Sequence, residues 1–305
     1  MNIIDVHMHF FNHPQSQERA KEAGHENSFP HLEEVFRRLG IVFGIAMGTG
    51  QMPEEETPKV IIPQIPYMGK DLSLEEGFSY PPFAAFCAGV NPTKITKKNL
   101  APTLDAYAKT LAHPRCVGLK LYAGYQYYYV ADPVYDPFYD LARQFHVPVV
   151  IHTGDTANPM GMLKYSHPLT VDEAAVLNPD VQFVMAHFGN PFFPEAAEVA
   201  KKNPNVAIDL SGMAVGTITK KDFLENYGGY VQHLKTWMGY LDQYEKLMWG
   251  TDWPLVNIDN YLDLFLDIVP PRHHGLVFYE NAVNTFGKIA PLLKNNCAED
   301  RAALS

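Results

Sequence analysis

A short run near the start of the chain, Asp5-Val6-His7-Met8-His9, places two histidines in a strand-like pattern. Side chains alternate between the two faces of a β-strand, so His7 and His9 are expected on one face, together with Asp5. Two imidazoles about 6–7 Å apart along a strand can bind one ion, and neutral imidazole is the commonest side-chain ligand of zinc and similar metals. Asp5 would lie one pleat deeper and orient His7 or a neighbouring strand. The pattern alone fits two solvent-facing histidines equally well.

Three further strand-like runs end in groups that bind metals. Val147–His152 and Phe183–His187 each end in a histidine, and Asp252 follows the run that begins at Leu247. In a (β/α)8 barrel the carboxyl-terminal strand ends surround one site, and functional residues collect there. One histidine at such a position is more often a hydrogen-bonded polar residue than a ligand. Four histidines and one aspartate at four strand ends favour a shared divalent metal.

The elements that would position these residues alternate along the chain. Apolar runs of strand length are separated by helix-like segments, which is typical of βα units and a parallel sheet. The eight strands are expected at Ile3–His9, Ile41–Met47, Ala84–Val90, Val117–Tyr122, Val147–His152, Phe183–His187, Val206–Leu210 and Leu247–Gly250. Helices are expected over Leu32–Leu39 and Phe138–Phe145, from Pro194, from an Asp259 N-cap to Ile268, and over Phe278–Phe286. We therefore predict an α/β protein with a single TIM-type (β/α)8 barrel.

The chain shows no internal repeat and no linker that would divide it. We expect the barrel to occupy residues 1–290 and residues 291–305 to form a peripheral tail. The segment Gly50–Met68 contains three consecutive glutamates, four prolines and no clear period, which predicts an irregular insertion over one end of the barrel.

Composition excludes several classes of partner. Lys and Arg total 24 against 34 Asp and Glu, a net charge of −10, which argues against nucleic acid or an anionic membrane surface. Three widely spaced cysteines form no disulfide framework. The start of the chain lacks the basic segment followed by an apolar segment that is typical of a signal peptide. No run approaches the ~18 apolar residues of a membrane-spanning helix. We expect a cytoplasmic enzyme that acts on a small molecule and that could form a homodimer.

These motifs resemble the amidohydrolase superfamily, and more closely its amidohydrolase-2 branch of (β/α)8 metal enzymes. The resemblance rests on the DVHMH opening, the IHTG and AHFG strand ends and the GTDWP segment. It is supported by Gly89-Val90-Asn91-Pro92, Gly118-Leu119-Lys120-Leu121-Tyr122 and Tyr279-Glu280-Asn281-Ala282. It extends from Asn2 to about Gly287 and is specific for the superfamily but not for a substrate.

The resemblance implies a role for each strand-end residue. His7, His9 and His152 would be metal ligands, and Asp252 would be both a ligand and a proton acceptor for water. His187 would be a catalytic acid/base or an oxyanion stabiliser in members with one metal, and a ligand of the second ion in members with two. Zn²⁺ fits these ligands best, although manganese, iron or cobalt fit the same set.

Lys120 decides the number of ions. Its place in the strand could aim it into the barrel, as in members where a carboxylated lysine bridges two metals. The alternative is an unmodified lysine that pairs with Asp5 or with a substrate carboxylate. We favour the unmodified lysine and hence one ion. Either way, a lysine inside a barrel needs an anionic partner or a shifted pKa.

Substrate contacts are expected from the loops that follow the strands. Tyr122 and Trp253 could stack on a flat ring. Asp155 and Asn190 could contact substrate or the ligands, and each could equally be a turn residue.

Three functions fit these observations. The first is a metal-dependent hydrolase that acts on a C–O or C–N bond of a small carbonyl compound, such as a lactone or cyclic amide. The second is a decarboxylase of an aromatic or muconate-type acid, for which Lys120, Arg115 and Arg272 are the nearest cationic candidates. The third is a non-catalytic barrel with a structural metal, although an imidazole and carboxylate set at a barrel mouth suits an open, catalytic ion better.

Overall fold

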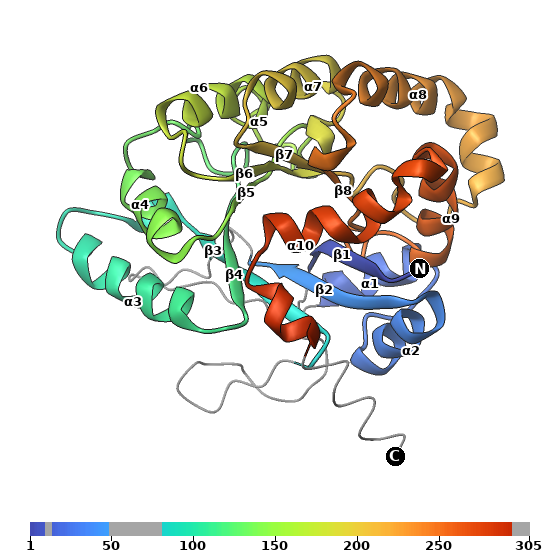
Figure 1. Ribbon diagram of the computed structural model, residues 1–305, viewed down its shortest axis with the longest axis horizontal. Coiled ribbons are helices and arrows are strands. Elements are labelled where there is room, and N and C mark those ends of the chain that lie inside the picture. The colour runs from blue at the N-terminus through green and yellow to red at the C-terminus, as the bar shows by residue number, and fades with distance from the viewer. Residues whose placement is uncertain (10–13, 49–80, 295–305) are drawn as a thin grey trace.

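A computed structural model describes residues 1–9, 14–48 and 81–294. Eight parallel strands follow one another in the sheet in the order of the sequence (Figure 1). They are β1 Ile3–Met8, β2 Ile41–Met47, β3 Ala84–Val90, β4 Cys116–Leu121, β5 Val149–Ile151, β6 Phe183–Met185, β7 Val206–Asp209 and β8 Leu247–Met248. All eight predicted strands are therefore present.

Backbone hydrogen bonds between the first strand and the segment after the last one bring the sheet back on itself. Val6 N donates to Trp249 O at 3.2 Å, and Asp252 N donates to His7 O at 2.8 Å. His9 N donates to Trp253 O at 2.7 Å. The predicted (β/α)8 barrel is thus confirmed, and this closure places Asp252 next to the histidines of β1.

The strands that carry site residues are shorter than predicted at their carboxyl ends. β5 and β6 stop before His152 and His187, and Ala186–Gly189 forms a short 3-10 turn, η2. The His187 backbone has φ 60°, a left-handed conformation that no strand can contain. These side chains therefore leave from the first residues of the loops, which lets them bend toward the barrel axis.

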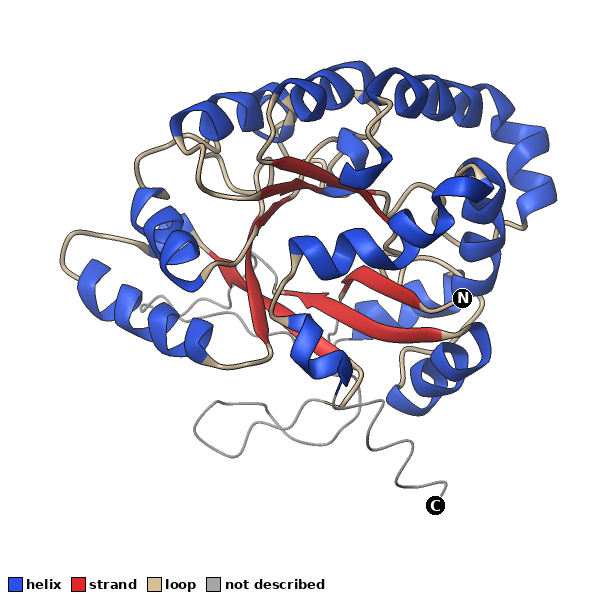
Figure 2. Ribbon diagram, viewed as in Figure 1, coloured by secondary structure: helices blue, strands red, loops and turns tan. Residues whose placement is uncertain are grey.

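Helices form an outer ring around the strands (Figure 2). The α-helices are α1 Pro14–Glu22, α2 Phe29–Leu39, α3 Leu100–Ala112, α4 Asp136–Phe145, α5 Leu163–Ser166, α6 Leu169–Leu177, α7 Phe193–Lys202, α8 Lys220–Leu241, α9 Ile258–Ile268 and α10 Asn281–Thr285. Short 3-10 or π turns are η1 Pro92–Lys94, η2, η3 Tyr244–Lys246, η4 Pro271–His273 and η5 Leu276–Glu280.

Two helix predictions need correction. The N-cap of α9 is Asn257, whose side chain accepts from Asn260 N at 3.2 Å, and not Asp259. Asp259 lies in the first turn, where its carboxylate pairs with Arg38 of α2. The predicted closing helix is divided, because η5 is a π turn that ends where α10 begins.

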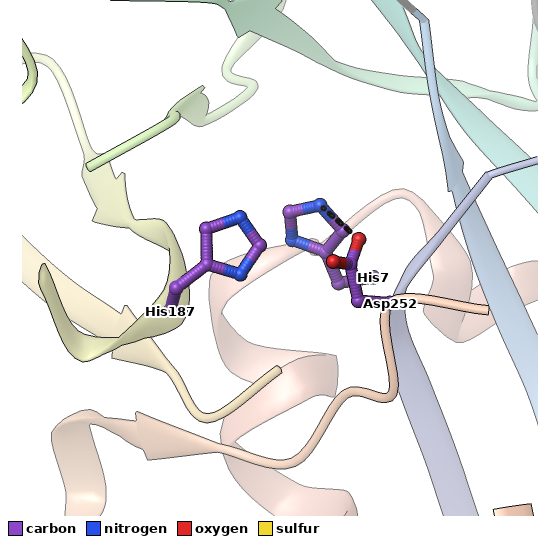
Figure 3. Close-up of side chains that lie close together, drawn as sticks. All are labelled: His7, His187 and Asp252. Carbon is purple, nitrogen blue, oxygen red and sulfur yellow. Dashed lines mark ion pairs between the residues drawn. The ribbon is translucent and has the colours of Figure 1, made fainter. Parts of the chain in front are cut away.

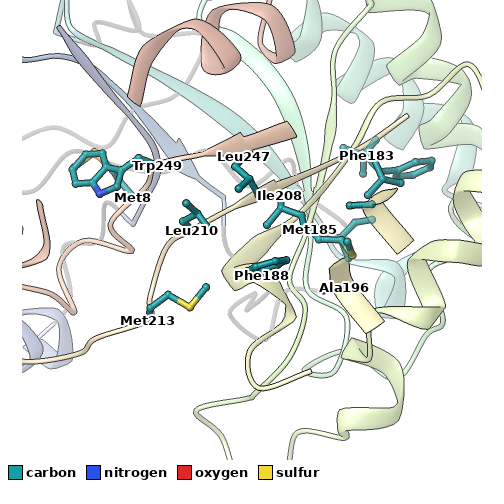
Figure 4. Packing of buried hydrophobic residues seen from close by; sticks show 14 of the residues in the cluster. Met8, Phe183, Met185, Phe188, Ala196, Ile208, Leu210, Met213, Leu247 and Trp249 are labelled. Atoms are coloured by element: carbon teal, nitrogen blue, oxygen red, sulfur yellow. The ribbon is translucent and has the colours of Figure 1, made fainter. Parts of the chain in front are cut away.

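Buried apolar side chains form two layers. One lies between the strands and the outer helices, where Leu247 and Ile208 pack beside Phe188 and Ala196 (Figure 4). The other fills the barrel interior with residues such as Phe43. The interior layer also includes four residues from the end of the described chain: Ala282, Phe286, Ile289 and Leu293.

Lys288 shows which end of the barrel this last segment covers. Its ammonium donates to the carbonyl oxygens of Leu111, His113 and Cys116 at 2.7, 2.9 and 2.7 Å. Those carbonyls precede or begin β4, so the segment closes the amino-terminal end of the strands, opposite the site histidines.

Some predicted features fall outside the described residues. The irregular insertion at 50–68 lies in the part that is not described, as does 295–305 of the predicted tail. No helix within the described ranges is long and apolar enough to span a bilayer.

Candidate metal centre at the carboxyl ends of the strands

His7 is held by a carboxylate from β7, the strand next but one to β1 around the barrel. Its Nδ1 lies 2.8 Å from Oδ2 of Asp209, the last residue of β7, and both side chains are buried. An ionised carboxylate accepts only, so Nδ1 of His7 carries the hydrogen. In the neutral ring Nε2 is then the atom with the free lone pair, which is the form that binds a metal.

The other oxygen of Asp209 organises the segment around His187. Oδ1 accepts from the backbone N–H groups of His187 and Ser211, each at 3.1 Å, and from the Ser211 hydroxyl. The Ser211 hydroxyl lies 2.9 Å from Nδ1 of His187. One carboxylate on β7 thus connects the histidine of β1 with the histidine that follows β6.

Asp252 completes a cluster with these two histidines. One ligand atom from each of His7, His187 and Asp252 lies within 4.8 Å of the other two. His187 comes from the loop after β6 and its ring points toward the other two side chains (Figure 3). The sequence prediction gave His187 a catalytic role in a one-metal site and a ligand role only in a two-metal site. The structure groups it with two predicted ligands, His7 and Asp252.

His9 and His152 lie at the edge of this cluster. Nε2 of His9 is 2.9 Å from Oδ1 of Asp252, and its ring centroid is 5.2 Å from that of His7. The His152 ring centroid is 5.0 Å from that of His187. Nε2 of His152 donates to the carbonyl of Asp155 at 2.9 Å, so Nδ1 is the nitrogen left for other partners. All five predicted strand-end residues therefore meet at one end of the barrel.

Burial keeps the imidazoles neutral. It lowers the pKa of His7 to about 3, with the nearby Lys120 ammonium adding to the effect. Burial also lowers the pKa of His187 and of His152. Since only a neutral imidazole can donate a lone pair, these shifts favour metal binding.

The two carboxylates stay ionised despite their burial. Burial alone would raise the pKa of Asp209, but contact with His7 holds it well below its usual range. Burial likewise opposes ionisation of Asp252, and the adjacent His9 together with His187 and His7 lowers its pKa strongly. The site therefore combines neutral nitrogen donors with anionic oxygen donors.

The backbone at the site adopts conformations that L-residues rarely use. His187 has φ 60° and Asp252 has φ 72°. Gly212 has φ 68°, and a Cβ added there would lie 3.1 Å from both Oδ2 of Asp252 and Nδ1 of His187. Left-handed non-glycine residues cluster at functional sites, where the surrounding structure holds them in place.

Lys120 reaches into the barrel as the alternation in β4 predicts. Its Nζ lies 3.5 Å from Nε2 of His7 and the side chain is fully buried. Burial lowers the pKa of this amine to about 8, although Asp209 and Asp252 oppose the shift. The carboxylate of Asp5 instead accepts from Thr251 N at 3.0 Å, from the Thr251 hydroxyl at 2.6 Å and from His7 N at 3.1 Å. Asp5 therefore joins β1 to the segment after β8, which is the orienting role expected for it.

The predicted substrate-contact residues divide into two groups. The Tyr122 hydroxyl lies 3.4 Å from Nδ1 of His9, and its ring is parallel to His152 at 6.0 Å, so Tyr122 borders the site. Trp253 needs correction: its indole is fully buried, stacks on His25 at 4.2 Å and donates to Asn27 at 3.3 Å. Trp253 therefore packs the segment after Asp252 onto the loop before α2 and offers no face to a substrate.

Asp155 and Asn190 behave as loop residues. The Asp155 carboxylate accepts from the N–H of Thr156 at 2.8 Å and the side chain is exposed. Asn190 Oδ1 accepts from the Tyr230 hydroxyl at 3.1 Å, and Asn190 O accepts from Asp155 N at 2.7 Å. Both residues thus connect the loops after β5 and β6, which is the turn alternative left open by the sequence.

The two arginines considered as carboxylate anchors lie at the wrong end of the barrel. Arg115 donates to the carbonyls of Pro81 and Ala84, before and at the start of β3. Arg272 lies beside His273, which stacks on Tyr244 ahead of β8. Lys120 is the cation from that set that the structure brings to the site.

Sequence reasoning missed Asp209, Ser211 and Thr251. A signal was available, because Asp209 is the polar residue that ends the apolar run of β7, in the same position as the strand-end histidines. Ser211 lies two positions past the end of β7, and Thr251 lies one position before Asp252. Both are small hydroxyl residues, and nothing in their local sequence distinguishes them from turn residues.

The residues present fit a divalent metal. Oδ1 of Asp252 is buried, and within the described part of the chain no donor makes a hydrogen bond of good geometry to it. It faces Nε2 of His9 at 2.9 Å and Nε2 of His7 at 3.7 Å. A buried carboxylate oxygen surrounded by imidazole nitrogens suits a cation, and imidazole with carboxylate is a common ligand set for catalytic zinc.

Comparisons with known proteins agree with this fold. The family model described as amidohydrolase matches residues 4–288. A search of curated proteins found no match.

Solved structures of similar fold cover 94% of this chain at low identity. A proposed 2-pyrone-4,6-dicarboxylic acid hydrolase from Pseudomonas putida is 15% identical over 98% of its own chain, with a TM-score of 0.58. An amidohydrolase from Burkholderia multivorans with bound zinc is 13% identical over 99% of its chain, with a TM-score of 0.59. A 5-carboxyvanillate decarboxylase from Sphingomonas paucimobilis is 12% identical over 99% of its chain, with a TM-score of 0.55. At these identities the likeness concerns the fold alone.

Proposed function

Because the chain belongs to the amidohydrolase family, we propose that it is a metal-dependent hydrolase that opens a C–O or C–N bond of a small carbonyl compound, such as a lactone or cyclic amide. The observation that carries this proposal is the convergence of His7, His187 and Asp252 within 4.8 Å, with a carboxylate oxygen that no donor among the described residues satisfies well. The 2-pyrone hydrolase of similar fold supports the choice of a cyclic ester.

We infer one ion, held by His7, His9, His152 and Asp252, with zinc as the metal that best matches these donors. A zinc-containing protein of the same fold supports this choice. A divalent ion would supply Lewis acidity, which brings the pKa of water toward about 7 and polarises a carbonyl. A second ion would require a bridging ligand such as a carboxylated Lys120, whose Nζ lies 3.5 Å from Nε2 of His7.

The side chains around the ion would do the remaining work. Asp252 stays ionised and can accept a proton from the attacking water. Tyr122 borders the same space and would pack against the substrate. His187 has two potential roles: accepting a proton at Nε2, or donating a hydrogen bond from Nε2 to the developing oxyanion. These roles require opposite protonation of Nε2.

The second candidate is decarboxylation of an aromatic or muconate-type acid. It is favoured by one observation, the buried Lys120 amine beside His7, which could pair with a substrate carboxylate. The decarboxylase of similar fold is consistent with it. With Arg115 and Arg272 at the opposite end of the barrel, this mechanism depends on Lys120.

The test begins with metal analysis of the purified full chain together with its intact mass. One ion per chain and an unmodified Lys120 are expected. Chelator-treated protein, before and after addition of Zn²⁺, Mn²⁺ or Co²⁺, is then assayed against lactones, cyclic amides and aromatic carboxylic acids. Metal-dependent ring opening without carbon dioxide release supports the hydrolase, whereas carbon dioxide release supports the decarboxylase. Two ions per chain would contradict the one-metal site, and a loaded protein inactive on all classes would favour a structural metal.

A further inference from the structure

The hydrogen bonds around His187 determine which of its nitrogens carries the hydrogen. Nδ1 faces two atoms of Ser211, the hydroxyl at 2.9 Å and the carbonyl oxygen at 3.2 Å. A carbonyl oxygen can only accept a hydrogen bond. Nδ1 must therefore be the donor if this contact is a hydrogen bond.

The Ser211 hydroxyl leads to the same assignment. Its single hydrogen is directed to Oδ1 of Asp209, an ionised carboxylate that can only accept. The hydroxyl oxygen is then available to Nδ1 of His187 only as an acceptor. Both partners of Nδ1 thus require a hydrogen on that atom.

The number of hydrogens on the ring completes the argument. The neutral imidazole, which is the form able to bind a metal or accept a proton, carries one hydrogen in total. If that hydrogen is on Nδ1, then Nε2 has none. Nε2 cannot donate a hydrogen bond to an oxyanion in this state.

We propose that Ser211, itself oriented by Asp209, is a positioning residue that holds His187 in the Nδ1–H tautomer, so that Nε2 enters the site as an acceptor of protons or a ligand and not as a hydrogen-bond donor. The catalytic meaning of this assignment rests on the proposed function, in which His187 acts on the substrate or on water. The assignment of the hydrogen itself does not depend on turnover.

Asp209 gives the arrangement a second consequence. Its Oδ2 imposes the same tautomer on His7, while its Oδ1 acts on His187 through Ser211. Two imidazoles, one from β1 and one from the loop after β6, therefore carry their hydrogen on Nδ1, and each has a ligand atom within 4.8 Å of one on Asp252. Of the two roles open to His187, proton acceptance fits this tautomer, and stabilisation of an oxyanion would have to come from another group.

The experiment reads the tautomer directly by long-range ¹H–¹⁵N correlation in the full-length protein labelled with ¹⁵N-histidine, without metal. The chain has 13 histidines, and the signals of His187 are those lost in His187→Asn. The expected result is an Nδ1–H pattern for His187 in the wild-type protein. An Nε2–H pattern in the wild type overturns the proposal without need of any variant.

Three variants test the part played by the serine hydroxyl. Ser211→Ala leaves only the weaker carbonyl partner, so the ratio of Nδ1–H to Nε2–H should fall on the order of fivefold, as expected for loss of one hydrogen bond. Ser211→Thr keeps a hydroxyl and should restore the wild-type ratio. Thr110→Val removes a buried hydroxyl on α3 that donates to Ala106 O at 2.9 Å, and should leave the His187 signals unchanged.

An unchanged ratio in a folded Ser211→Ala protein would show that the hydroxyl does not position the ring and would overturn the proposal. Because the measurement uses metal-free protein and no substrate, it remains decisive if the hydrolase assay finds no activity. Absence of turnover with the expected tautomer would contradict only the proposed function.

Discussion

Asp209 and His7 are separated by 202 positions in the sequence, yet Oδ2 of Asp209 lies 2.8 Å from Nδ1 of His7 across the buried end of the barrel. Carboxylate partners of this kind fix the tautomer and orientation of a metal-binding imidazole and raise its basicity. The pair therefore links the strongest motif in the sequence to a residue that the motif does not contain.

Asp209→Asn should weaken zinc binding by about 10–100-fold, which is the usual effect of removing such a partner. The amide replaces a full negative charge with a group whose NH₂ can face Nδ1 of His7, so the Nδ1–H tautomer is no longer enforced. The measurement is a competition titration of the chelator-treated protein against a chromophoric zinc chelator. Asp263→Asn, which removes an exposed carboxylate paired with Lys220, is the matched control. Equal zinc affinity in both variants would refute the role assigned to Asp209.

Gly212→Ala should disturb the site without changing any polar group. The new Cβ would lie 3.1 Å from both Asp252 Oδ2 and His187 Nδ1, and the φ of 68° disfavours any L side chain by about 1 kcal/mol or more. We expect a lower midpoint of thermal unfolding together with weaker zinc binding, measured by calorimetry on the same preparations.

Gly239→Ala is the control for Gly212→Ala. Gly239 lies inside α8, and a Cβ there meets nothing within 4 Å. Alanine is favoured over glycine in a helix by about 1 kcal/mol, so this variant should be as stable as the wild-type protein or more stable. If Gly212→Ala behaved like Gly239→Ala, the close approach of Gly212 to Asp252 and His187 would have no effect on stability or zinc binding.

Asp5 should make the stability of the metal-free protein depend on pH in an unusual direction. Burial raises the pKa of Asp5 from 3.8 to about 7, against the opposing hydrogen bonds from Thr251 and His7. At pH values between 3.8 and about 7, the folded state therefore keeps a proton on Asp5 that the unfolded state has released. Stability contributed by protonated Asp5 is complete below pH 3.8 and is lost as the pH rises toward about 7.

Asp5→Asn removes this contribution and keeps an acceptor for the N–H of Thr251. The free energy of unfolding of the wild-type protein, relative to Asp5→Asn, should decrease from pH 5 to pH 7, roughly the range set by the linkage relation. Urea unfolding at several pH values measures the difference. A difference independent of pH would mean that Asp5 ionises normally in the folded state.

Lys120→Met should stabilise the metal-free protein at neutral pH while impairing function. A buried ammonium loses hydration that its neighbours only partly replace, and its pKa of about 8 records that cost. Methionine has a similar volume without charge. The advantage of the variant should shrink as the pH rises above 8, roughly where the folded wild-type protein loses the proton that its unfolded state retains. Unfolding measurements at pH 7 and pH 9.5, about 2.5 units apart around this step, test it. A variant less stable than the wild type at both values would contradict the prediction.

Much of the fold could be read from local patterns. Continuously apolar runs such as Ile41–Met47 and Ala84–Val90 match β2 and β3 residue for residue, because strands buried on both faces need apolar side chains throughout. Strand ends were less predictable. The run Phe183–His187 continues as far as the histidine in hydropathy, but the backbone leaves the sheet at Ala186 because His187 takes a left-handed conformation.

The sequence by itself determined the parallel barrel, the end of the barrel at which His7, His9, His152, His187 and Asp252 collect, and the kind of ligand they offer. Those features follow from residue type and from periodicities that act over a few positions. Only the tertiary structure decided the hydrogen-bond partners, which are Asp209 and Ser211 for the imidazoles and Thr251 for Asp5. It also decided that Trp253 is buried and that Arg115 lies at the far end of the barrel. Contacts between residues some 200 positions apart depend on barrel closure and on how each loop leaves its strand, and neither leaves a mark in the local sequence.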